Sequence, residues 1–214
     1  MFKRFIAVLL LPFMISYFLR FLYVLSLVYQ YFDVLHAFVI GFFIFTLGYF
    51  LVFRRRMSFW LTLEHELTHI LFAILMLKPV SGLFVTKYAG GATWLEKKPN
   101  FLIRLAPYFF PTFPMVILLL KPIINVTYWV PYQFVLGFFS GYHWFSSLKE
   151  SHPAQSDLQT DGLLFSYVFI FLMHSIFLSC IIIVLLDDWH VFGMFLKDGF
   201  LQTIDFFRSF IQIK

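Results

Sequence analysis

The chain has 214 residues, of which 61% are hydrophobic and 13% are charged, and its formal net charge is +5. Because soluble domains carry about 25% charged residues, this composition excludes an ordinary soluble protein and predicts a multi-pass protein of the lipid bilayer. The basic residues lie in short loops between apolar runs, where they set orientation, so the net charge indicates no nucleic-acid partner.

Apolar runs follow one another along the chain, each about as long as the 20 residues that a membrane-spanning helix needs. They predict spans at residues 4–29, 34–53, 58–77, 101–120, 128–147 and 161–186. The fold class that we expect is therefore an all-α polytopic membrane protein with about six transmembrane helices. Residues 1–57 would form an N-terminal transmembrane hairpin, 58–186 a membrane core, and 187–214 a C-terminal amphipathic helix.

The charges at the ends of the first two spans predict how the chain is oriented. By the positive-inside rule, Lys3, Arg4 and the cluster Arg54–Arg56 face the cytoplasm. The third span then starts from the cytoplasmic side, and His65 lies about one to two turns in from that surface.

The third span contains His65-Glu66-Leu67-Thr68-His69. On a helix the two histidines are one turn apart and share a face, so together they can bind one Zn²⁺, with Glu66 as general base. Ionisable groups inside a span cost about 2–3 kcal/mol each when charged and are usually functional. The alternative is that Glu64, His65 and Glu66 form a polar helix start near the lipid headgroups.

The segment 78–98 has a different pattern. Residues 80–88 and 92–95 are β-like, and Gly90-Gly91 between them is a good signal for a two-residue turn. We expect a β-hairpin whose edge strand binds an extended peptide, with Tyr88, Gly90 and Gly91 as substrate-binding residues. An ordinary loop is the alternative.

A polar segment, residues 149–162, comes directly before the last span and supplies candidates for a third metal ligand. A catalytic zinc site needs three protein ligands and leaves the fourth position for water. The candidates are Asp157, Asp161 and, more weakly, His152.

The HExxH motif in a membrane helix, the following Gly90-Gly91 hairpin and an Asp-Gly before a later helix resemble the site-2 protease (M50) family of intramembrane zinc metalloproteases, in its divergent bacterial branch. The resemblance covers residues 58–186. It implies His65, His69 and Asp157 (or Asp161) as ligands of Zn²⁺ and Glu66 as the catalytic base. It also implies a membrane-protein substrate and a place in the bacterial inner (cytoplasmic) membrane.

The chain departs from the family pattern at several positions. Thr68 stands where the family often has Gly, and Thr160 replaces the Leu of Leu-Asp-Gly. Pro153 matches the family's Asn-x-x-Pro, but the Asn is absent. The span count raises a further conflict: if the third, fourth and fifth spans each cross once, residues 149–162 emerge on the side opposite His65.

Two functions from different classes follow. The first is an intramembrane zinc endopeptidase. The second is a non-catalytic membrane subunit of a larger complex, in which the polar groups form a structural metal site or a polar relay.

Overall fold

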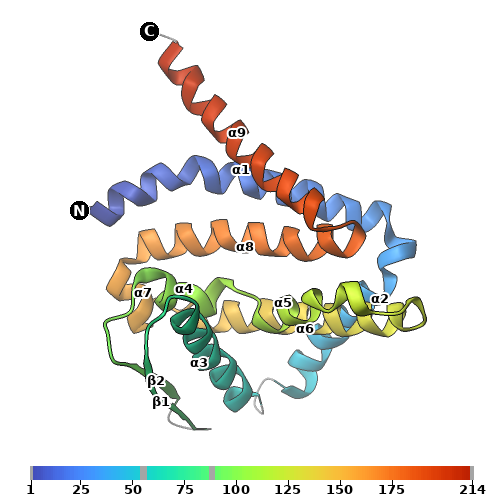
Figure 1. Ribbon diagram of the computed structural model, residues 1–214, viewed down its shortest axis with the longest axis horizontal. Coiled ribbons are helices and arrows are strands. Elements are labelled where there is room, and N and C mark those ends of the chain that lie inside the picture. Colours follow the sequence, from blue (N-terminus) through green and yellow to red (C-terminus); the bar gives the residue numbers. More distant parts are fainter. Residues whose placement is uncertain (1, 54–56, 87–89, 213–214) are drawn as a thin grey trace.

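The computed structural model describes residues 2–53, 57–86 and 90–212, and nearly all of these are helical (Figure 1). In chain order the elements are α1 (Phe2–Gln30), α2 (Phe32–Gly48) with a π-helical turn (Tyr49–Phe53), α3 (Ser58–Leu75), β1 (Val80–Val85), β2 (Gly91–Leu95), α4 (Phe101–Phe109), α5 (Thr112–Leu119), two 3₁₀ turns (Lys121–Ile123 and Val126–Tyr128), α6 (Trp129–Glu150), α7 (Ser156–Asp161), α8 (Leu163–Leu186) and α9 (Trp189–Gln212). The predicted all-α class with a short hairpin is confirmed.

Fewer helices in the described part of the chain meet the length and composition of a membrane span than the sequence predicts. Among the described residues, three helices are long and apolar enough to cross a membrane: α1, α2 with its π turn, and α8. The pair α4–α5 qualifies only as a broken span, bent by 79°. The helices α3 and α6, predicted as the third and fifth spans, are not in this set. The long apolar helices are compatible with a membrane protein, but the count of six is not reproduced.

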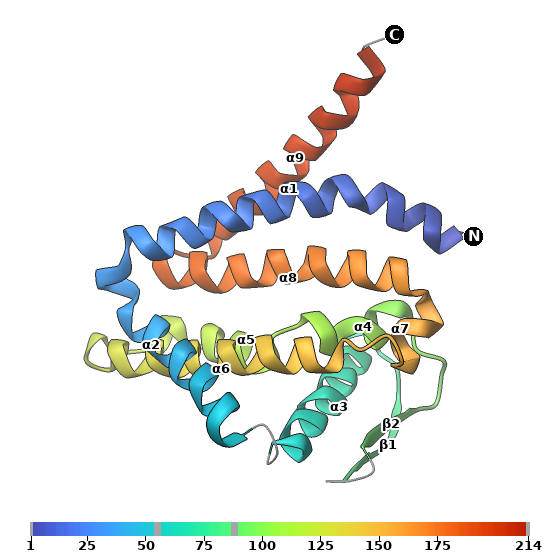
Figure 2. The same ribbon diagram turned by 180° about the vertical axis from the view of Figure 1, so that it is seen from behind.

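The long helices pack in two pairs. One pair is α1 with α8, and the other is α2 with α6; Figures 1 and 2 show α8 between α1 and α6. The α2–α6 contact needs glycine. A Cβ on Gly137 would lie 1.9 Å from the Phe38 carbonyl oxygen, and one on Gly41 would lie 2.1 Å from that of Phe134. Small residues of this kind let two helix backbones approach closely.

The C-terminal helix α9 packs along α1 within the same chain. Tyr17 donates a hydrogen bond to the Leu196 carbonyl (2.7 Å), and Arg20 donates one to Gln202 (3.1 Å). The C-terminal end of α9 points away from the other helices (Figures 1 and 2), although Phe207 still meets Phe13 of α1 with ring centroids 6.3 Å apart. Four polar residues of α9, Asp198, Gln202, Asp205 and Ser209, are exposed.

The predicted hairpin is present, but its turn is not the one that we expected. β1 and β2 pair antiparallel, and Gly91 is the first residue of β2, opposite Val85. The connection therefore runs over residues 86–90, and the prediction of a two-residue Gly90-Gly91 turn is wrong. Gly90 does have a positive φ of 78°. Tyr88 lies outside the described residues.

The segment 149–162, which the span count placed on the side opposite His65, lies at the same end of the molecule as α3. Figures 1 and 2 show α3, the hairpin and α7 toward the same end, where the N-terminus also lies. Here α3 is an oblique helix, and α4 packs against α3, α6, α7 and α8. The chain bends by 79° between α4 and α5, and the polar segment containing Asp157 meets the histidines of α3.

Candidate metal centre

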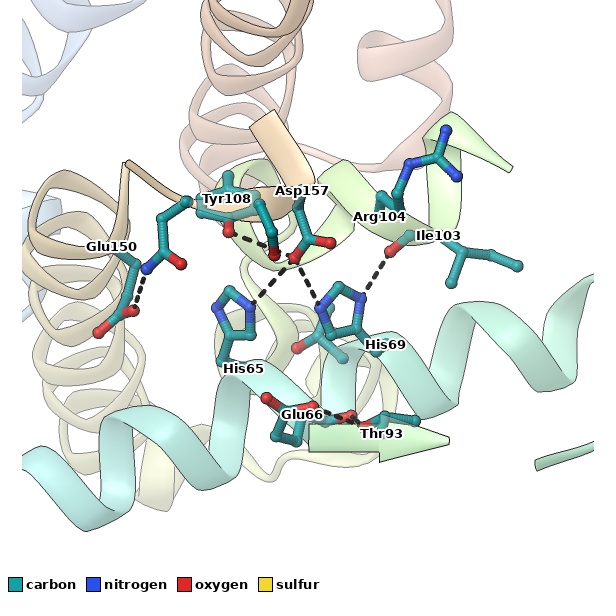
Figure 3. A network of polar contacts seen from close by, with 12 residues as sticks. His65, Glu66, His69, Thr93, Ile103, Arg104, Tyr108, Glu150 and Asp157 are labelled. Carbon is teal, nitrogen blue, oxygen red and sulfur yellow. Dashed lines mark hydrogen bonds and ion pairs between the residues drawn. The ribbon is translucent and has the colours of Figure 1, made fainter. Parts of the chain in front are cut away.

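α3 and α7 bring three side chains with metal-binding atoms together. His65 and His69 lie one turn apart on α3, and Asp157 is the second residue of α7. The Asp157 Oδ2 atom is 3.9 Å from His65 Nε2 and 3.4 Å from His69 Nε2 (Figure 3). All three ligand atoms lie within 4.8 Å of one another. Ligands about 2.0–2.2 Å from a tetrahedral zinc ion lie roughly 3.3 Å apart, so the set fits Zn²⁺ with little adjustment.

The tautomer of His69 suits a metal ligand. Its Nδ1 lies 2.8 Å from the carbonyl oxygen of Ile103, and because a carbonyl only accepts, Nδ1 must be the protonated nitrogen. Nε2 faces Asp157, and in the neutral imidazole its lone pair would be free to bind a metal. Metal-binding histidines almost always donate their other ring N–H in this way.

Pro107 explains why the Ile103 carbonyl is free to accept this bond. In a helix that carbonyl would take the N–H of the residue four positions later, which is position 107. Pro107 lies inside α4 and has no backbone N–H. The missing donor leaves the Ile103 oxygen available, and His69 uses it.

The two histidines favour the charged form of the Asp157 carboxyl. Burial raises the pKa of this carboxyl, but hydrogen bonds and positive charge from His65 and His69 outweigh burial and hold its pKa below the usual range. Tyr108 of α4 donates a longer hydrogen bond to Asp157 Oδ2 (3.4 Å). The Tyr108 ring also meets the edge of His65, with ring centroids 5.1 Å apart. One aromatic side chain therefore contacts two members of the set.

Asp161, the alternative ligand, lies in a different environment. Its carboxylate accepts hydrogen bonds from Arg104 Nε and Nη2, each 2.7 Å long, and pairs with Lys3. Burial raises the pKa of Asp161, while the two cations lower it by more, so that its pKa lies below the ordinary value. The third candidate, His152, is exposed and accepts a hydrogen bond from the Ala154 N–H. The geometry therefore favours Asp157.

Glu66 is buried between α3 and the hairpin. Its Oε2 accepts a hydrogen bond from the Thr93 hydroxyl (2.7 Å), and the same hydroxyl lies 3.2 Å from the Glu66 carbonyl oxygen. Figure 3 shows Glu66 on the side of α3 that faces β2, while His65 and His69 point toward Asp157. Glu66 follows His65 in the sequence, but its carboxylate faces β2, where Thr93 fixes the side chain.

The hairpin residues predicted to bind substrate lie at unequal distances from α3. Gly91 touches it: a Cβ there would lie 2.6 Å from Thr62 Cγ2 and 2.7 Å from Glu66 Cγ. A Cβ on Gly90 would meet nothing within 4 Å. Of the two described glycines, Gly91 borders the site and Gly90 faces open space.

Sequence reasoning missed the residues that support this set, namely Thr93, Ile103, Arg104 and Tyr108. One acts through its backbone, and the others are ordinary residues of a strand or an apolar helix. Only Pro107 gave a local signal, because a proline inside a helix marks a free carbonyl four residues earlier.

Comparisons with protein-family models, with curated proteins and with solved structures find no match to this chain.

Proposed function

We propose that this chain is an intramembrane zinc endopeptidase that cleaves a membrane-protein substrate in or near its transmembrane segment. The observation that carries the proposal is the convergence of His65, His69 and Asp157, with ligand atoms within 4.8 Å. Among the described residues this group supplies three protein ligands, the number typical of catalytic zinc, whereas structural zinc sites are closed by four. The chain would act in a lipid bilayer, and we expect the bacterial inner membrane.

Each residue of the site would have a separate role in the reaction. His65, His69 and Asp157 would hold the ion, with the Ile103 carbonyl orienting His69. Bound zinc supplies a Lewis acid that polarises a carbonyl and acidifies water. Glu66 would take the proton of the attacking water and return it to the leaving amine. The hydroxyl of Thr93 holds the Glu66 carboxylate for this task.

The hairpin is suited to hold an unwound substrate. A helical substrate hides its carbonyls in hydrogen bonds and must be extended before hydrolysis. The described sheet has two strands, so each strand has one edge without a backbone partner in the sheet. Since β2 lies against Glu66, its edge would pair with a substrate strand beside the metal ligands.

The test measures zinc and cleavage separately. Protein purified in detergent without chelators should contain about one zinc per chain. His65→Ala, His69→Ala and Asp157→Asn should each lose it. Glu66→Gln should keep zinc but lose cleavage of single-span membrane proteins reconstituted with the enzyme. Asp205→Asn, an exposed position on α9, is the matched control and should change neither quantity.

The non-catalytic alternative gives a different result. A structural metal site would also lose zinc in the His65 and Asp157 variants. Cleavage that is equal in wild type and Glu66→Gln, or absent from both while zinc is bound, would favour that alternative over a protease.

A further inference from the structure

A buried group of charges lies at the end of α7. The Asp161 side chain has no exposed surface, and Arg104 donates two hydrogen bonds to it, one to each oxygen. Lys3, in the first turn of α1, pairs with the same carboxylate, and Arg104 also donates to the Pro99 carbonyl. Buried ion pairs often contribute no net stability over apolar replacements, so stability alone does not explain this group.

The group joins the two elements that complete the metal site. Arg104 directly follows Ile103, whose carbonyl accepts the bond from His69. Asp161 lies four residues, about one helical turn, after Asp157 on α7. Figure 3 shows the Arg104 side chain directed away from the imidazoles, so it leaves the metal ligands themselves untouched. One ion pair therefore fixes α4 relative to α7.

α7 needs such an anchor. It has six residues, and isolated helices shorter than about 12–15 residues are marginal in water. Apart from the contacts of Asp157 itself with His65, His69 and Tyr108, α7 is held by the buried side chain of Leu158, the bond from Ser166 to the Leu158 carbonyl, and Asp161. If Asp161 were released, α7 could turn about its axis and carry Asp157 away from His65 and His69.

We propose that Lys3, Arg104 and Asp161 form a clamp that positions Asp157 and the Ile103 carbonyl for metal binding. The inference rests on the proposed zinc site. All three are positioning residues, since they act through Asp157 and His69. The Lys3 side chain is 42% exposed and that of Arg104 is 11% exposed, so Lys3 contributes less than Arg104.

The experiment measures metal affinity in purified full-length protein. Zinc affinity is determined by competition with a chromogenic chelator, and the visible spectrum of the Co²⁺-loaded protein reports ligand geometry. Asp161→Asn should weaken zinc binding by about 10- to 100-fold and alter the Co²⁺ bands, as loss of outer partners does at other metal sites. Lys3→Gln should give a smaller loss. Asp205→Asn breaks an exposed pair with Arg208 (3.3 Å) and should change nothing.

A double variant separates positioning from stability. Arg104→Gln with Asp161→Asn removes both members of the main pair, so no cation of that pair stays buried alone. It should regain thermal stability over Asp161→Asn but keep the weak zinc binding. Zinc affinity that recovers together with stability would overturn the clamp, as would a normal affinity in Asp161→Asn. Wild-type protein that takes up neither Zn²⁺ nor Co²⁺ would overturn the proposed function as well.

Discussion

Gly91→Ala tests whether the hairpin presses on Glu66. The added Cβ would lie 2.6 Å from Thr62 Cγ2, 2.7 Å from Glu66 Cγ and 2.9 Å from Glu66 Oε1, whereas ordinary contacts begin at 3.4 Å. Strand or helix must therefore move by about 0.8 Å, which is 3.4 minus 2.6. Overpacking of this kind costs about 1–3 kcal/mol. At roughly 2–4 °C per kcal/mol for a chain of this size, the melting temperature should fall by about 2–12 °C.

The catalytic consequence of Gly91→Ala should be larger than the loss of stability. A displacement of about 1 Å in a catalytic group can cost roughly 100-fold in rate. Zinc content should stay normal, because the atoms nearest to a Cβ at Gly91 belong to Thr62 and Glu66, neither of which is in the ligand set. Melting temperature, zinc content and cleavage rate are measured on the same preparation. Gly193→Ala in α9, where a Cβ meets nothing within 4 Å, is the control and should be neutral or slightly stabilising. Unchanged melting and cleavage in Gly91→Ala would refute the described packing of β2 on α3.

Further substitutions test single contacts of the site. Thr93→Val removes the hydroxyl that donates to Glu66 and should slow cleavage about tenfold with zinc retained. Thr93→Ser keeps a hydroxyl and should cleave at nearly the wild-type rate. Equal cleavage rates in Thr93→Val and wild type would show that this hydrogen bond has no role in catalysis. Pro107→Ala gives α4 a backbone N–H that competes with His69 for the Ile103 carbonyl. The variant should therefore have a higher melting temperature but bind zinc several-fold more weakly. An unchanged zinc affinity would contradict the role assigned to the Ile103 carbonyl. The lowered pKa of Asp161 means that its contribution to stability is present above about pH 4 and is lost as the pH falls further. In metal-free protein titrated from pH 5 to 2, Asp161→Asn should therefore lose less stability than wild type, and parallel curves would argue against the ion pair.

The helical elements and two of the candidate metal ligands could be predicted because local patterns determine them. The spacing of His65 and His69 places both on one face of any helix, whatever packs against it. Asp157 and Asp161 are also one turn apart, on α7, so helix geometry alone does not choose between them, and the preference for Asp157 rested on the family resemblance. The choice depends on Arg104, which is 57 positions from Asp161 along the chain and meets it only in the folded structure.

The errors in the hairpin and in the span count also have physical causes. Glycine is used where φ must be positive or where a Cβ would not fit, and a sequence does not show which need applies. Gly90 has a positive φ, whereas Gly91 lies where a Cβ would not fit. The predicted two-residue turn assumed a positive φ at both positions. The apolar run 101–120 looked like one span, but the chain bends between α4 and α5 at Pro111.

The clamp and the ligand set join distant parts of the chain, and this affects when the site can form during biosynthesis. Lys3 and Asp161 are 158 positions apart, and His69 and Asp157 are 88 apart, which is 157 minus 69. A nascent chain grows by about 5–20 residues per second, so one that has reached only the end of α6 carries both histidines but lacks the carboxylate. A ribosome-bound intermediate would hold the HExxH helix for seconds without a complete ligand set. Hydrolytic competence would then begin only after α7 is synthesised and docked.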